Sequence, residues 1–186
     1  MIQLHCTQKL FAKLPVDASG QIRCQRPSYL AANDAPKSPL SGWHANLILL
    51  QRRNCVLFVH DMTRFPVLIT CLTKPGFANL DSLFQDAFLS TLLKAGATQE
   101  QFETAAKYLT PFFCDTDCNR SVQGTMNHMK QDIENLLWYD NLQVTHLSNI
   151  RTGIWLADRP CNVKGLKDAI WPLSEMLGLL DHFAKK

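Results

Sequence analysis

The chain has 186 residues, of which 46% are hydrophobic, and this is enough for one domain with a sizeable buried core. It has no run of about 18 apolar residues and no signal-peptide pattern at its start, which argues against a membrane span and against secretion. The net charge is +3, and aromatic residues do not interleave with the scattered charges as they do in a base-stacking surface. We therefore expect a single globular domain over residues 1–186, in the cytoplasm and without a membrane partner.

The first predicted elements are a strand, a short helix and a long loop. Apolar and polar residues alternate over residues 2–6, which is typical of a strand. Thr7 then precedes an apolar helical spacing that ends at Pro15, so we predict a two-turn helix capped by Thr7. Residues 15–42 are rich in proline and glycine and predict a long surface loop.

A β-hairpin forms the centre of the predicted fold. Two apolar runs, residues 43–50 and 55–61, flank the polar residues 51–54. Both runs are apolar at nearly every position, as in a sheet that is covered on both faces. A third run, residues 65–72, is predicted to be the antiparallel neighbour, with Pro66 at its start or on a sheet edge.

Helices dominate the rest of the prediction. Apolar spacing and capping residues predict four of them, over residues 80–92, 98–109, 119–139 and from Pro172 onward. Residues 142–147 and 150–157 are predicted to be two further strands. This order favours an α+β domain in which an antiparallel or mixed sheet is built around the central hairpin and meander and packs with about four to five helices.

The hairpin contains the first candidate site. A loop centred on Arg52 and Arg53 pairs His44 directly with Asp61, and Arg64 follows in the next turn. A carboxylate that fixes the imidazole tautomer is typical of a general base, and an arginine there can hold an anionic substrate. A structural His–Asp pair that ties the strand ends together is the alternative interpretation, and a one-residue slip in register would separate the two side chains.

A second candidate site lies at the start of the helix predicted over residues 119–139. Asn119 is a natural N-cap, and Arg120 and Ser121 stand beside free backbone N–H groups, as in a small anion site. Capping alone also explains Asn119. Arg52 and Arg53 become part of a phosphate-binding patch only if they meet other basic residues on one face.

The seven cysteines are odd in number and scattered, which favours free thiols in a reducing compartment. Only Cys114 and Cys118 are closely spaced, with His128 further along the chain. Because no second cysteine pair is present, capping and packing explain this spacing better than zinc does. We predict neither a metal nor any other cofactor.

Charge is divided unevenly along the chain, because residues 1–75 carry nine basic residues against three aspartates and residues 76–186 carry ten against thirteen acidic residues. A basic half indicates an anionic partner or, equally, ordinary surface charge. Phosphate-binding loops, dinucleotide fingerprints, zinc-protease motifs and the hydrolase nucleophile elbow are all missing from the sequence.

Five segments of the sequence are long enough to be specific. They are residues 1–7 (MIQLHCT), 41–47 (SGWHANL), 52–61 with 63–66 (RRNCVLFVHD and TRFP), 119–127 (NRSVQGTMN) and 155–161 (WLADRPC). These segments resemble a bacterial protein family of unknown function. The resemblance implies a bacterial, single-domain protein, and it implies no mechanism.

The leading functional prediction is a protein that binds an anionic partner, either nucleic acid or a phosphorylated small molecule, through Arg52, Arg53, Arg120 and Ser121. The first alternative is a metal-independent enzyme that acts on a phosphate ester or phosphodiester. In that enzyme His44 is the general base, Asp61 orients it, and Arg64 and Arg120 stabilise developing charge. The second alternative is a protein–protein regulatory or inhibitor module that uses the loop at residues 15–42 or the hairpin tip.

Overall fold

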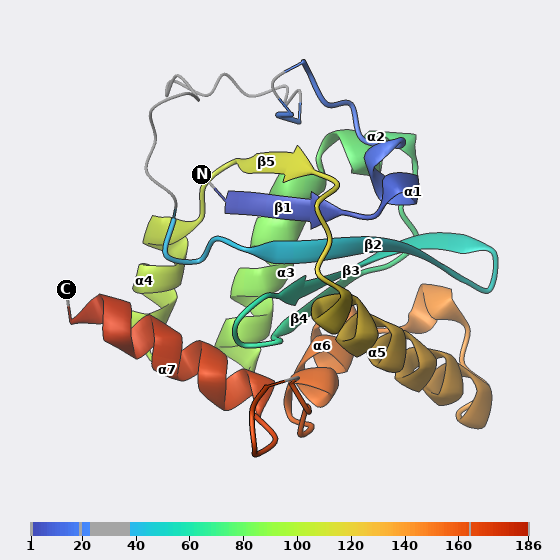
Figure 1. Ribbon diagram of the computed structural model, residues 1–186. Helices are drawn as coiled ribbons and strands as arrows, with labels where there is room; N and C mark the ends of the chain where they lie inside the picture. The colour runs from blue at the N-terminus through green and yellow to red at the C-terminus, as the bar shows by residue number, and fades with distance from the viewer. Residues whose placement is uncertain (1, 19, 23–37, 164, 186) are drawn as a thin grey trace.

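The computed structural model describes residues 2–18, 20–22, 38–163 and 165–185, and in this part of the chain one five-stranded sheet lies between helices (Figure 1). Most of the predicted loop at residues 15–42 lies outside the described residues, namely positions 19 and 23–37. Within the described ranges, no helix is both long enough and apolar enough to cross a membrane.

The sheet is mixed, which is one of the two forms, antiparallel or mixed, that the sequence predicted. Its strand order is β4-β3-β2-β1-β5. The pairs β2 with β3 and β3 with β4 are antiparallel, whereas β1 runs parallel to both β2 and β5. Pro66 begins the edge strand β4, where its missing N–H interrupts no ladder. The strand bounds are β1 Ile2–Cys6, β2 Trp43–Leu50, β3 Arg53–His60, β4 Pro66–Ile69 and β5 Phe112–Asp115.

The register of the central hairpin differs from the prediction by two residues. Leu50 pairs with Arg53, and His44 pairs with Val59 instead of Asp61. The loop consists of two residues, Gln51 and Arg52, both with positive φ. Such a turn matches the twist of the flanking strands, and it tightens the hairpin beyond the four-residue break that the polar residues indicated.

The helices are α1 Gln8–Phe11, α2 Lys74–Ala78, α3 Leu80–Lys94, α4 Gln99–Tyr108, α5 Arg120–Tyr139, α6 Asn149–Ala157 and α7 Pro172–Ala184, with a 3-10 turn at Val144–His146. The predicted capping box of α4 is confirmed, because Thr98 and Gln101 exchange side-chain and backbone hydrogen bonds. The first helix is shorter than predicted, and the Thr7 side chain makes no cap hydrogen bond to it. The Thr7 hydroxyl donates instead to the side-chain oxygen of Asn46.

Both strands predicted after α5 are wrong. Residues 142–147 form a loop with the 3-10 turn, and residues 150–157 lie in α6. Ser148 caps α6 by accepting from the N–H of Arg151, and Thr152, Gly153, Leu156 and Ala157 are buried at helical spacing. Short apolar runs do not distinguish a strand from a buried helix, which explains the error.

Helices cover both faces of the hairpin, as its continuous apolar runs indicated (Figure 1). One face packs against α3, α4 and α7, and large rings such as Trp43, Phe58 and Phe84 fill this core. The other face packs against α5, whose apolar stripe includes Met126 and Ile133. The apolar spacing that predicted this helix therefore lies on its core-facing side. On this second face, polar side chains replace the apolar core next to the N-terminus of α5.

Candidate functional site

Four titratable side chains from four strands or strand ends meet beside the N-terminus of α5. We call His5, His44, Asp61 and Asp115 the polar cluster. His5 lies in β1, His44 in β2 and Asp115 in β5, and Asp61 directly follows β3. Because side chains alternate along a strand, all four point to the face of the sheet that α5 covers.

The predicted contact between His44 and Asp61 is present in spite of the shifted register. His44 Nδ1 lies 2.5 Å from Asp61 Oδ1, and the His44 residue is only 2% exposed. A two-residue shift keeps every side chain on its face, so the pair is diagonal instead of directly opposite. The backbone N–H of Asn119 donates to His44 Nε2 at 2.6 Å. His44 therefore carries its proton on Nδ1, donates it to Asp61, and has both ring nitrogens occupied by protein groups.

His5 forms a second His–carboxylate pair that the sequence analysis missed. Its Nδ1 lies 2.8 Å from Asp115 Oδ1. The Asp115 carboxylate is fixed further by the side-chain amide of Gln3 at 2.6 Å and by the backbone N–H of Asp117 at 2.9 Å. His5 Nε2 faces Asp61 Oδ2 at 3.9 Å, which is too long for a hydrogen bond. Within the polar cluster, His5 Nε2 is thus the histidine nitrogen that makes no hydrogen bond to a described residue.

A signal for this second pair exists in the sequence, but it depends on a strand that was not predicted. Gln3 and His5 are the polar positions of the alternating strand β1, so both lie on one face. Asp115 ends β5, which is only four residues long and follows Pro111. Once β5 is placed parallel to β1, the register puts His5 directly beside Asp115.

Arg64 brings a buried positive charge to the edge of the polar cluster. The residue is 5% exposed and has a φ of 59°, which is uncommon for a long side chain. Its Nη1 donates to the backbone carbonyl of Asp61, and its Nη2 donates to Ser121 Oγ at 3.3 Å. Its Nε is buried and has no hydrogen-bond partner in the described part of the chain. Burial lowers the pKa of this guanidinium from its usual value, and no described carboxylate forms an ion pair with it.

The guanidinium of Arg64 contacts the first turn of helix α5. The Asn119 side chain accepts from the N–H of Ser121 at 2.8 Å, so the predicted N-cap is confirmed. Next to it lies a hollow of about 530 Å³ whose wall includes Arg120, Ser121, Gly124, His128, Arg159 and Cys161. A Cβ on Gly124 would meet no atom within 4 Å, so this part of the helix faces open space. The helix start thus brings the positive end of the helix dipole, the Ser121 hydroxyl and the side chains of Arg120 and Arg159 to one hollow.

The candidate anion-binding residues do not all lie together. Arg120 and Ser121 stand at the start of α5, near Arg64. Arg52 and Arg53 lie exposed at the hairpin tip, at the opposite end of β2 and β3 from His44. A strand of this length separates the two groups by about 25 Å. The structure therefore joins the candidate catalytic residues to Arg120 and Ser121, and it leaves the hairpin arginines apart.

Cys114 and Cys118, the closely spaced cysteines, are held by packing and by hydrogen bonds within the protein. Cys114 is buried in β5, and the Cys118 thiol donates to the carbonyl of Cys6 at 3.4 Å. A hydrogen bond with the Cys114 thiol, together with burial, raises the pKa of Cys6 above its usual value, so this thiol stays protonated. His128 lines the hollow beside α5, whose wall includes neither Cys114 nor Cys118. No group of three or more metal-binding side chains occurs among the residues that the structure describes.

Comparison with known proteins gives one match. A protein-family model described as "Domain of unknown function (DUF6933)" matches residues 3–175, which is nearly the whole chain. The predicted membership of a family of unknown function is therefore confirmed. No curated protein and no solved structure matches the chain.

Proposed function

Since the chain belongs to the DUF6933 family, whose function is unknown, we propose a function from the site alone: the protein binds a phosphate-bearing ligand at the N-terminus of α5. The observation that carries this proposal is Arg64, a guanidinium that is 5% exposed and has no carboxylate partner among the described residues.

A buried charge without a counter-charge lowers stability by several kcal/mol, and an apolar side chain of the same size would avoid this cost. The carboxylate nearest in the chain, Asp61, is already hydrogen-bonded to His44. Its charge attracts Arg64 without forming an ion pair, and its backbone carbonyl accepts a hydrogen bond from Arg64. A bound anion would supply a counter-charge in direct contact with the guanidinium. Phosphate suits this role because guanidinium groups bind its oxygens with two parallel hydrogen bonds.

The surroundings of Arg64 favour an anion as well. Arg64 Nη2 reaches Ser121 Oγ, so the guanidinium and the first turn of α5 contact each other. The first turn contains no acidic residue, and the N-terminal end of a helix carries a partial positive charge. Arg120 and Arg159 line the adjoining hollow of about 530 Å³, which is large enough for a phosphate group and the atoms attached to it.

Calorimetric titration with pyrophosphate and with inorganic phosphate, at about 50 mM salt, tests this proposal. We expect Arg64→Met to weaken pyrophosphate binding by at least about tenfold, because it removes charge-assisted hydrogen bonds. Arg53→Met is the matched control, since Arg53 is exposed at the hairpin tip, and it should bind as the unaltered protein does. Ser121→Ala, a milder change at the same helix start, should weaken binding less than Arg64→Met.

Thermal unfolding of each variant guards against a folding artefact. Arg64→Met should be at least as stable as the unaltered protein, because it replaces a buried charge by an apolar chain of similar length. Equal pyrophosphate affinity in Arg64→Met and the unaltered protein would overturn the proposal. An unaltered protein that binds neither anion at low salt would overturn it too.

A second candidate function, a phosphate-ester hydrolase, is favoured by the His5–Asp115 pair. In this proposal His5 is the general base, because both nitrogens of His44 already bind protein groups. A water attacks phosphorus, His5 Nε2 takes the proton of that water, the bond from phosphorus to the leaving oxygen breaks, and the proton passes to that oxygen. Asp115 fixes the His5 tautomer, and Arg64 stabilises the negative charge on the phosphoryl oxygens.

Hydrolysis of p-nitrophenyl phosphate and bis(p-nitrophenyl) phosphate distinguishes this enzyme from a simple binding protein. His5→Gln should abolish turnover and leave pyrophosphate binding intact. His146→Gln, which alters an exposed histidine of the 3-10 turn, is the matched control. Turnover that survives His5→Gln would contradict the hydrolase proposal without affecting the binding proposal.

A further inference from the structure

The hollow beside the start of α5 continues along the helix. A second hollow of about 760 Å³ lies between α5 and α6, and both hollows include Asp132 and Arg159 in their walls. Six of the α5 residues that line these hollows follow one stripe at helical spacing: Ser121, Gly124, His128, Asp132, Asn135 and Tyr139. We call the two joined hollows the α5 trough. Along the helix axis, from Arg120 to Tyr139, it extends over about 28 Å.

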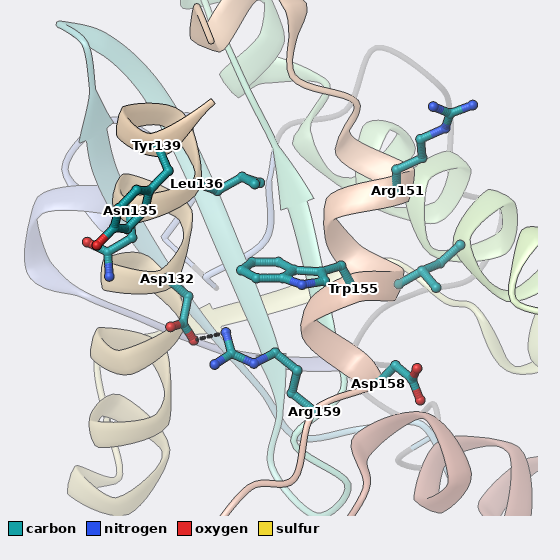
Figure 2. Close-up of a pocket in the computed structure, with 9 residues that line it drawn as sticks. Asp132, Asn135, Leu136, Tyr139, Arg151, Trp155, Asp158 and Arg159 are labelled. Carbon is teal, nitrogen blue, oxygen red and sulfur yellow. Dashed lines mark ion pairs between the residues drawn. The ribbon is translucent and has the colours of Figure 1, made fainter. Parts of the chain in front are cut away.

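The far part of the α5 trough contains exposed aromatic rings. In Figure 2 the indole of Trp155 extends from α6 toward α5, and Tyr139 stands on the α5 side. Trp155 is 39% exposed and Tyr139 is 76% exposed. The Arg159 guanidinium lies over the Trp155 ring, 4.9 Å from its centroid, and ion-pairs with Asp132 at 2.8 Å (Figure 2). Aromatic rings that are only partly covered, with an arginine at hand, are the features on which nucleobases stack.

Charge is graded along the α5 trough. At the α5 start, Arg120 forms no ion pair with any described residue, and Arg64 lies buried behind Ser121. Midway, the charge of Arg159 is balanced by Asp132. The positive end therefore coincides with the helix N-terminus, and the aromatic end is close to neutral. This arrangement fits a ligand that carries phosphate groups and flat bases on one chain.

We propose that the α5 trough binds single-stranded nucleic acid, with a phosphate group at the start of α5 and a base against Trp155. The proposal rests on the proposed function, because the phosphate contact at Arg64 and Ser121 is shared. A single strand fits better than a duplex, since only unpaired bases expose a face to an aromatic side chain. The trough is also longer than one phosphate group requires, which favours a chain of nucleotides over inorganic phosphate.

Fluorescence anisotropy with fluorescein-labelled dT12 and U12, at about 50 and 200 mM salt, tests the trough. Trp155→Ala should weaken binding by about tenfold, because one base loses its stacking partner. Trp171→Ala is the matched control: Trp171 is 48% exposed and does not line the trough, so affinity should be unchanged. With two phosphate contacts, at Arg64 and Arg120, the fourfold rise in salt should weaken binding about sevenfold.

Pyrophosphate titration of the same variants separates the two proposals. Trp155→Ala should bind pyrophosphate as the unaltered protein does, whereas Arg64→Met should lose both ligands. If pyrophosphate binds and the oligonucleotides bind no tighter, or if Trp155→Ala leaves their affinity unchanged, the trough proposal is overturned and the anion site stands. Equal affinity for a poly-glutamate peptide of the same charge, or for the duplex form of the oligonucleotide, would also overturn it.

Discussion

His60 ties the stability of the site to pH. This residue ends β3 directly before Asp61 and is fully buried. Its Nδ1 accepts from the N–H of Thr63 at 3.3 Å and lies 2.9 Å from the Thr63 hydroxyl, while its carbonyl accepts from the N–H of Arg64. Neutral His60 therefore holds the turn that carries both Asp61 and Arg64. Protonation of Nδ1 would remove the acceptor that Thr63 uses.

Burial lowers the pKa of His60 from 6.5 to about 4, and the charge of Asp61 opposes this shift only in part. A histidine whose pKa is lowered in the folded state contributes full stability above pH 6.5. As the pH falls below 6.5, His60 binds a proton in the unfolded chain but stays neutral in the folded chain. The free energy of unfolding therefore falls until the pH reaches the pKa of His60 in the folded chain. At 1.36 kcal/mol per pKa unit, the loss between pH 7.5 and pH 5 is about 2 kcal/mol, and it approaches about 3 kcal/mol near pH 4.

Urea unfolding of the unaltered protein and of His60→Gln, at pH 7.5 and at pH 5, measures this contribution. Glutamine retains an acceptor for Thr63 and does not titrate, so comparison of the two proteins cancels the other titrating groups. The unaltered protein should lose about 2 kcal/mol more than the variant does over this pH range. Equal losses, within about 0.5 kcal/mol, would refute the reasoning, because they would mean that His60 protonates without unfolding the protein.

Two further substitutions test the site and the scaffold. Gly42→Ala should cost about 1 to 2 kcal/mol in urea unfolding and weaken pyrophosphate binding, because Gly42 has a φ of 93° and an added Cβ would lie 3.0 Å from Asp61 Oδ2. The matched control is Gly96→Ala, which has a φ of 87° but no atom within 4 Å of the added Cβ; it should leave binding unchanged, and equal effects on binding would contradict a steric role for Gly42. Thr98→Ala should cost about 1 kcal/mol by removing the α4 cap, and the Tm should fall by about 2 to 4 °C. Thr73→Ala, at a helix start without a side-chain cap bond, should cost less, and a loss as large as that of Thr98→Ala would show that the cap contributes nothing.

The elements that could be predicted from the sequence are those with a local signal. The hairpin strands, α3, α4, α5 and α7 all carry a repeated apolar period or a cap, and these features act over a few residues. The segment that forms α6 was predicted to be a strand, because its apolar residues suit a strand equally well and the cap at Ser148 was not recognised. Strand β5 is too short to show a period, and it forms only because β1 offers it a parallel edge.

The candidate site was partly predictable for the same reason. His44 and Asp61 belong to one hairpin, and an error of two residues in register left them on the same face. The pairing of His5 with Asp115 joins positions 110 residues apart, so no local pattern indicates it. Arg64 was singled out beside the hairpin and Ser121 at a helix start, but only the packed structure brings these two side chains into contact.

The sequence by itself determined the class of the fold, the hairpin at its centre, the N-cap at Asn119 and most of the residues that meet around it, because each of these depends on neighbours along the chain. Only the tertiary structure decided which histidine of the polar cluster has an unoccupied nitrogen and which arginine is buried without an ion pair among the described residues. It also decided that the hairpin arginines stand apart from the start of α5. The same holds for the α5 trough, where Trp155 and Arg120 line one surface although 35 residues separate them. Burial and distance arise only when the elements pack, and these two quantities distinguish a binding site from a list of polar residues.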